Sequence, residues 1–189
     1  MRHKYETRGI VLARTSLGEA SALVTLLTPD LGLLRARAQS VRWSGAKLSA
    51  ALTTFAESRL VLVHGREGWR VAGAVLEVNW FQKIAHAKAR TVAARVSGLL
   101  VRLVGGETSD SRLFGVVRGF FEALETLTED THEAAETLAA LRVLAALGLD
   151  AGDIPGAASE FTLPVLDEVR REHSRYIARI NNGIAASGL

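Results

Sequence analysis

The chain has 189 residues, enough for one domain or two small ones, and its 48% hydrophobic and 23% charged residues are ordinary for a soluble globular protein. It contains no cysteine, which excludes disulfide bonds and thiolate zinc sites. The N-terminus is charged and no apolar run approaches about 20 residues, which argues against a signal peptide and a membrane span. We therefore expect a cytoplasmic protein that contacts no membrane.

The positive charge is concentrated in the first half of the chain. Residues 1–80 hold 11 Lys and Arg against 6 Asp and Glu, whereas residues 81–189 hold 12 against 14. A basic surface attracts nucleic acid, because each phosphate contact releases counterions. A nucleic-acid contact is therefore expected in the first half.

Short β-type runs separated by turn signals fill most of this first half. Pro29 and Gly32 bound an expected tight turn, since proline presets φ and glycine accepts a positive φ. A five-residue hairpin loop is expected at residues 64–68. Five short strands with a long excursion before the fourth predict an oligonucleotide/oligosaccharide-binding (OB) barrel. The expected strands cover residues 7–15, 22–28, 33–39, 59–63 and 69–75.

The third of these strands alternates small apolar residues with Arg35 and Arg37, so the two arginines share one face. Arg8 and Arg70 are expected to be ordinary exposed strand residues. The alternative to a binding surface is a solvated strand face with Trp43 packed against the barrel. The predicted nucleic-acid surface tracks phosphates with basic side chains and stacks a base on one tryptophan: Arg14, Arg35, Arg37, Arg42, Trp43, Lys47 and Arg66.

From residue 78 onward the apolar residues recur at helical spacing. Ser109 or Asp110 is the expected cap of the second helix, and Asp130 with Glu133 the expected capping pair of the third. His173 lies on the apolar face of the last helix and is expected in the core. The apolar stripes predict helices over residues 85–103, 113–127, 138–145 and 163–181.

These patterns together predict an α+β protein. An N-terminal OB-fold β-barrel is expected over residues 1–79, followed by an all-α helical domain over residues 80–189. The change from a period of two to a helical period places the boundary.

A second basic group lies on the first expected helix, where Lys88, Arg95 and Arg102 recur every seven residues beside the apolar stripe. A basic stripe that flanks an apolar groove suits an acidic, hydrophobic peptide with a terminal carboxylate. The alternative is a solvated helix face.

Catalytic and metal-binding patterns are missing from the sequence. The five histidines are scattered, and none forms an i, i+4 pair that could bind a metal. Gly105 and Gly106 lack the preceding strand and the following Lys-Ser/Thr of a phosphate-binding loop. No enzyme activity, metal or other cofactor is expected.

Residues 9–48 read GIVLARTSLGEASALVTLLTPDLGLLRARAQSVRWSGAKL. This run resembles the start of the bacterial RecO family of recombination mediators. The shared pattern is a first strand, a Glu-x-Ser element at Glu19 and Ser21, an apolar strand ending at Thr28, a turn closing on Gly32, and a strand that leads into a basic segment. The resemblance extends over residues 8–77 and, more loosely, to the leucine-rich stretch 138–149.

The resemblance implies a mediator of DNA repair and homologous recombination in the RecF pathway. Such proteins bind single- and double-stranded DNA, anneal complementary strands, and work with RecR and the single-stranded-DNA-binding protein to load RecA. Their helical domain receives the acidic C-terminal tail of the single-stranded-DNA-binding protein, and they break no bonds.

The chain departs from the family pattern at two places, and it is also shorter than most members. Gln39 and Ser40 stand where many members have lysine and glycine, and residues 150–161 carry no cysteines for the zinc module of some members. The first departure keeps an alternative open, a non-catalytic protein-interaction adaptor whose barrel no longer binds DNA.

Overall fold

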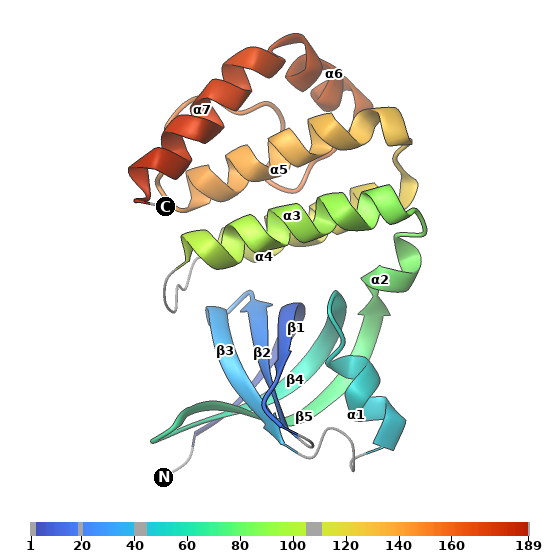
Figure 1. Ribbon diagram of the computed structural model, residues 1–189, viewed down its shortest axis with the longest axis vertical. Helices are drawn as coiled ribbons and strands as arrows, with labels where there is room; N and C mark the ends of the chain where they lie inside the picture. The colour runs from blue at the N-terminus through green and yellow to red at the C-terminus, as the bar shows by residue number, and fades with distance from the viewer. Residues whose placement is uncertain (1–2, 19–20, 40–44, 105–110, 189) are drawn as a thin grey trace. The chain divides into compact units, whose positions relative to one another are not determined.

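The computed structural model describes residues 3–18, 21–39, 45–104 and 111–188 (Figure 1). Contacts divide the chain into two compact units. The main part of the first unit ends at Lys83 and holds all the strands that these residues form, and the second unit begins at Ile84 and is helical. The predicted α+β class is confirmed. A division into separate domains at residues 79 and 80 stays a prediction.

The strands of the first unit close into a barrel with the order β1-β2-β3-β5-β4. Neighbouring strands are antiparallel except β3 and β5, which run parallel where residues 36–38 face residues 69–71. The predicted OB-type barrel and all five predicted strands are confirmed, and each strand is longer than predicted. The strands are β1 (His3–Ser16), β2 (Ser21–Thr28), β3 (Gly32–Gln39), β4 (Ala56–Gly65) and β5 (Gly68–Asn79).

Alternation along each strand builds the barrel core, because successive side chains point to opposite faces of a sheet. α1 (Gly45–Ala51) follows β3 in the chain, and its Leu48 packs against this core. The core side chains come from all five strands and from the residue after α1, and include Val11, Val24, Leu26, Leu34, Ala36, Leu52, Leu60, Leu62 and Trp69.

The turn between β2 and β3 forms as predicted. Gly32 has φ of 65°, a conformation that glycine adopts without a steric cost. The Thr28 hydroxyl donates to the Gly32 carbonyl at 3.1 Å and accepts from the Leu31 amide at 2.9 Å. The turn is therefore stabilised by the hydrogen bonds of Thr28 and by a glycine at the position that requires a positive φ.

The predicted five-residue loop between β4 and β5 is wrong. Gly65 pairs with Gly68, so only Arg66 and Glu67 form the loop. Gly68 has φ of 88°, which lets the strand pairing continue to the tip of the hairpin. The hairpin consequently projects its loop residues from paired strands.

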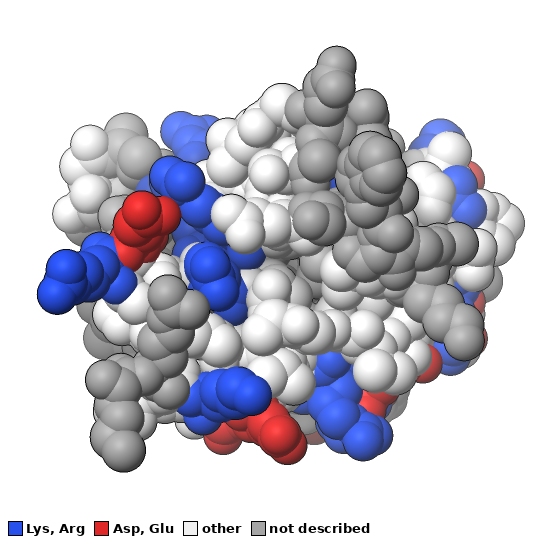
Figure 2. All heavy atoms as spheres, turned by 90° about the horizontal axis from the view of Figure 1, so that it is seen from below, with Lys and Arg blue, Asp and Glu red and all other residues white. Residues whose placement is uncertain are grey.

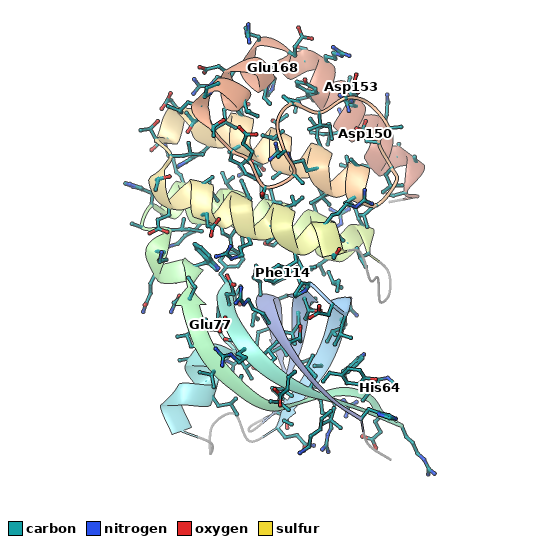
Figure 3. The ribbon with its side chains drawn as sticks, turned by 180° about the vertical axis from the view of Figure 1, so that it is seen from behind. His64, Glu77, Phe114, Asp150, Asp153 and Glu168 are labelled. Carbon is teal, nitrogen blue, oxygen red and sulfur yellow. The ribbon has the colours of Figure 1, made fainter. Side chains whose placement is uncertain are left out.

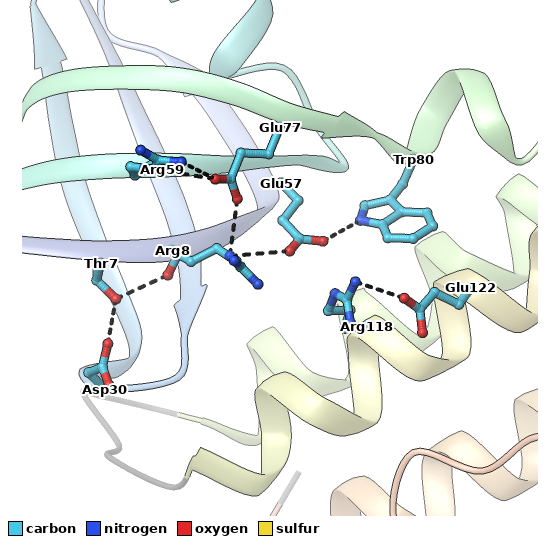
Figure 4. Close-up of polar contacts among 9 residues, drawn as sticks. All are labelled: Thr7, Arg8, Asp30, Glu57, Arg59, Glu77, Trp80, Arg118 and Glu122. Carbon is cyan, nitrogen blue, oxygen red and sulfur yellow. Dashed lines mark hydrogen bonds and ion pairs between the residues drawn. The ribbon is translucent and has the colours of Figure 1, made fainter.

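A polar network joins β1, β4 and β5 to α2 (Trp80–Lys83) (Figure 4). Glu57 is buried, and its Oε2 accepts a hydrogen bond from Trp80 Nε1 at 3.0 Å. Arg8 Nε lies 3.8 Å from Glu57 Oε1 and 3.0 Å from Glu77 Oε2. Arg59 Nη2 lies 3.1 Å from the other oxygen of Glu77. The charges of Arg8 and Arg59 are thus neutralised within the first unit.

The second unit packs its helices around α5 (Figure 1). α5 is buried on nearly every side, because α3, α6 and α7 each contact it. The predicted stripe of the second helix is confirmed for Leu113, Val117, Phe120 and Leu124, which are buried. Its last predicted member, Leu127, follows α4 and is half-buried. The elements are α3 (Ala87–Leu103), α4 (Ser111–Thr126), the short 3₁₀ helix η1 (Glu129–Thr131), α5 (His132–Ala146), α6 (Leu163–Arg171) and α7 (His173–Ala186).

The single predicted helix over residues 163–181 is two helices. Glu172 leaves helical geometry, with φ of −102° and ψ of 18°, and separates α6 from α7. The break changes which residues of α7 face inward, so that Tyr176 and Ile180 are buried. His173 is therefore not in the core, and its Nε2 lies 3.7 Å from Glu133 Oε1.

Two other predictions concern helix starts. The capping pair at Asp130 and Glu133 is wrong, because α5 follows η1 directly and its N-cap residue, Thr131, makes no side-chain capping bond. Asp130 accepts instead from Thr128 and Arg170. The predicted cap at Ser109 or Asp110, at the start of α4, lies outside the described residues.

For the first helix of this unit, the predicted stripe is confirmed in part. Ala89, Val92 and Val96 are buried, whereas Ala85 is exposed and precedes α3.

Candidate nucleic-acid interface

The outer face of β3 carries Arg35 and Arg37. Both arginines are exposed, while the intervening Ala36 and the flanking Leu34 and Ala38 are buried in the barrel. The predicted sharing of one face is confirmed. Period-two alternation is sufficient to place these two guanidinium groups outside the core.

A third arginine lies beside them. The parallel register of β3 and β5 puts Arg70 directly opposite Arg37. Residues paired in register point to the same face of a sheet, and neighbouring strands lie about 4.8 Å apart. The two side chains therefore leave adjacent backbones on the same side. The row continues across the barrel, since Arg70 pairs with Val63 on β4 and Val63 pairs with Lys4 on β1. We name Lys4, Arg35, Arg37 and Arg70 the basic row.

The arginines of the basic row have no counterion among the described residues. Among the residues that the structure describes, none forms an ion pair with Arg35, Arg37 or Arg70, in contrast to Arg8 and Arg59. Like charges opposite each other on a sheet are destabilising. A bound anion that bridges these side chains would relieve that repulsion.

The β4–β5 hairpin adds a hollow of about 490 Å³ to this region. Arg66 is exposed at the hairpin loop and lines the hollow, and Figure 3 shows His64 at the same end of the barrel. One acidic residue, Glu67, also lines it. In Figure 2, lysine and arginine side chains gather on the barrel surface that faces the viewer, with few acidic side chains among them. The hollow is therefore bordered mainly by positive charge.

The structure does not bring all the predicted residues together. Arg14 pairs with the buried Val24, so register places it on the opposite face of the sheet from the basic row. Arg42 and Trp43 lie outside the described residues. Lys47 belongs to α1, and its side chain is outside the described part of the chain.

Two residues of the basic stripe predicted on the first helix pair with glutamates of η1 and α5. Lys88 pairs with Glu129, and Arg95 Nε donates to Glu136 Oε1 at 2.5 Å. Through this hydrogen bond Glu136 raises the pKa of Arg95, and Lys88 lowers the pKa of Glu129. Arg102, in the last turn of α3, is exposed.

A hollow of about 400 Å³ lies beside these ion pairs, and Val92 contributes to its lining. Its presence leaves room beside the ion pairs. Binding of an acidic peptide at Lys88, Arg95 and Arg102 stays a prediction.

The carboxylates of this second unit predict an acid-sensitive fold. Hydrogen bonds from Lys88 and from Thr128 lower the pKa of Glu129 and of Asp130, and Ala157 does the same for Glu160. A carboxyl with a lowered folded-state pKa stabilises the fold above its unfolded pKa, about 4, and loses that effect as pH falls through the folded value. The melting temperature is therefore expected to decline as pH falls below about 4. The decline attributable to these groups is modest, because Glu129 and Asp130 are exposed and water screens such contacts.

Thermal unfolding followed by circular dichroism between pH 3 and 7 checks this expectation. The variant Glu129→Gln with Asp130→Asn should show a shallower decline, whereas Glu168→Gln, on the surface of α6 (Figure 3), should follow the wild type. Identical profiles for all three proteins would contradict it.

The described segments were also searched for membrane-spanning helices and for metal-binding clusters. None of their helices is long and apolar enough to cross a membrane. Nor do they bring together three or more His, Cys, Asp or Glu side chains that could hold a metal ion.

Comparison with known proteins gives consistent matches. The family model described as "Recombination protein O N terminal" matches residues 1–75. A DNA repair protein RecO from Dehalococcoides mccartyi is 30% identical over 127 residues, which are 67% of this chain and 50% of that protein. A DNA repair protein RecO from Roseiflexus sp. is 32% identical over 121 residues, 64% of this chain and 42% of that protein. The chain thus spans about half the length of these relatives.

Proposed function

Since the chain belongs to the RecO family of DNA repair proteins, we propose that it binds single- and double-stranded DNA and anneals complementary strands. We further propose that it helps to load RecA onto strands coated with single-stranded-DNA-binding protein. The observation that carries the proposal is the basic row, in which Arg37 and Arg70 lie side by side without an internal counterion among the described residues.

The chemistry of this function is binding rather than bond breaking. Two complementary strands repel each other through their phosphates, and cationic side chains that replace counterions reduce this repulsion. A protein that holds one strand along an arginine face lowers the electrostatic cost of approach for the second. Base pairing then supplies the free energy of annealing, so no catalytic residue is required.

Partner binding forms a second part of the proposal. RecR and the C-terminal tail of the single-stranded-DNA-binding protein are the proposed partners, with the tail received near Lys88, Arg95 and Arg102. An acidic tail at this place would compete with Glu129 and Glu136 for Lys88 and Arg95. Exposed ion pairs contribute only about 0–1 kcal/mol each, so such an exchange is energetically accessible.

Strand annealing tests the proposal against an adaptor function. Two complementary fluorescent oligonucleotides are mixed with and without the protein, each bare or coated with single-stranded-DNA-binding protein. We expect the protein to accelerate annealing of both bare and coated strands. An adaptor whose barrel does not bind DNA, the alternative suggested by Gln39 and Ser40, would leave the rate on bare strands unchanged.

A further inference from the structure

Three aromatic side chains meet at the hairpin end of the barrel. The rings of Tyr5 and Trp69 lie 5.1 Å apart between centroids at an interplanar angle of 68°, an edge-on contact. The rings of His64 and Trp69 lie 4.7 Å apart and are tilted by 59°. Trp69 therefore contacts both of the other rings, one from β1 and one from β4. We name Tyr5, His64 and Trp69 the aromatic cluster.

The members of the aromatic cluster differ in exposure. Trp69 is 9% exposed and belongs to the barrel core, whereas Tyr5 is 38% exposed and His64 is also exposed. Strand pairing fixes their backbones, since His64 pairs with both Trp69 and His3. Each of the two accessible rings thus contacts a buried one.

The aromatic cluster reaches the hollow of the hairpin through one of its members. His64 lines that hollow together with Arg66 and Arg70. An unpaired nucleotide presents a flat apolar base at one end and a phosphate at the other. The arrangement offers a ring for the first and guanidinium groups for the second within one site.

We propose that Tyr5 and His64, backed by Trp69, form a stacking platform for an unpaired base, with Arg66 and Arg70 holding the adjacent phosphates. The inference rests on the proposed function and adds a selection for single strands. Bases within a duplex are already paired and stacked, so they cannot lie on a protein ring without being extruded. Stacking on an aromatic side chain strengthens binding of a base and is tolerant of sequence.

The test compares two ligands with equal phosphate charge. Fluorescence anisotropy measures binding of the whole chain to an oligothymidylate and to an abasic oligonucleotide of the same length. The wild type is expected to bind the oligothymidylate about 5- to 150-fold more tightly. In the variant Tyr5→Leu with His64→Ala this preference is expected to disappear. The affinity for the oligothymidylate falls to that for the abasic strand, which stays unchanged.

A matched control replaces another exposed aromatic side chain of the first unit. Phe81→Leu, in α2 beyond the far end of β5, should retain the wild-type preference. Circular dichroism and melting temperature establish that the variants fold. If a folding defect appears in Tyr5→Leu with His64→Ala, each single variant is measured in its place, and each is expected to lose part of the preference.

The possible failures are distinguishable. Equal wild-type affinity for the two ligands, or an undiminished preference in the folded Tyr5 and His64 variants, would overturn the stacking platform and leave DNA binding intact. Absence of binding to either ligand would overturn the proposed function, and the platform with it.

Discussion

Replacing Arg35 and Arg37 together by alanine is expected to weaken binding to single-stranded DNA by roughly tenfold or more, without dependence on sequence. Both side chains are exposed on one face of β3, and Arg37 lies beside Arg70. Each lost phosphate contact lowers the slope of log affinity against log salt by about 0.7 for a single strand, so two contacts lower it by about 1.4. Titrations at several salt concentrations measure both quantities.

A control with the same change of charge distinguishes specific contacts from net charge. Arg59 and Arg175 are exposed but engaged in ion pairs with Glu77 and Glu172. Their joint replacement by alanine is expected to change affinity by less than about threefold, since paired surface charges contribute little to phosphate binding. Equal losses in the two double variants would remove the basic row from the interface.

Replacing Arg142 by methionine is expected to lower the free energy of unfolding by about 2–4 kcal/mol. Arg142 is 4% exposed within α5. It donates to the carbonyls of Glu160 at 2.6 Å and Pro155 at 2.9 Å, and its guanidinium lies 4.7 Å from the centroid of the Phe161 ring. Methionine fills a similar volume but donates no hydrogen bond. The two carbonyls, which lie in the segment that connects α5 to α6 (the connector), are then left without their donor.

Burial lowers the pKa of Arg142 to about 10, so the side chain still carries its charge at neutral pH. That charge makes the two carbonyl contacts stronger than neutral hydrogen bonds.

Chemical denaturation measures the loss against Arg112→Met as a control. Arg112 is exposed and donates to the Ala146 carbonyl at 3.1 Å, and its replacement is expected to cost less than about 1 kcal/mol. The Arg142 variant, below its melting temperature, should retain its affinity for single strands, because the basic row lies in the other unit. A loss no larger than that of the control would show that the connector does not depend on Arg142.

The barrel could be predicted from the sequence because its determinants are local. Alternation in residues 33–39 places Arg35 and Arg37 outside, and the glycine of the β2–β3 turn has the positive φ that its position requires. Arg70 was predicted to be an ordinary exposed residue. Its place beside Arg37 depends on the parallel register of β3 and β5, strands that are separated by α1 and β4 in the chain.

The helical unit shows the same limit of local reasoning. The apolar stripe of α4 predicts its buried face, but the break at Glu172 has no strong local signal such as glycine or proline. The spacing of Lys88 and Arg95 predicts a basic stripe, whereas their pairing with Glu129 and Glu136 depends on helix packing across 41 positions of sequence. The aromatic cluster was missed for the same reason, because strand pairing brings its three members together.

We propose above all that the basic row holds DNA strands for annealing. The most direct measurement is the rate at which complementary bare oligonucleotides anneal in the presence of the wild type and of Arg35→Ala with Arg37→Ala. We predict acceleration by the wild type that is largely lost in this variant and retained in Arg59→Ala with Arg175→Ala. Equal acceleration by all three proteins, or none by the wild type, would contradict the claim.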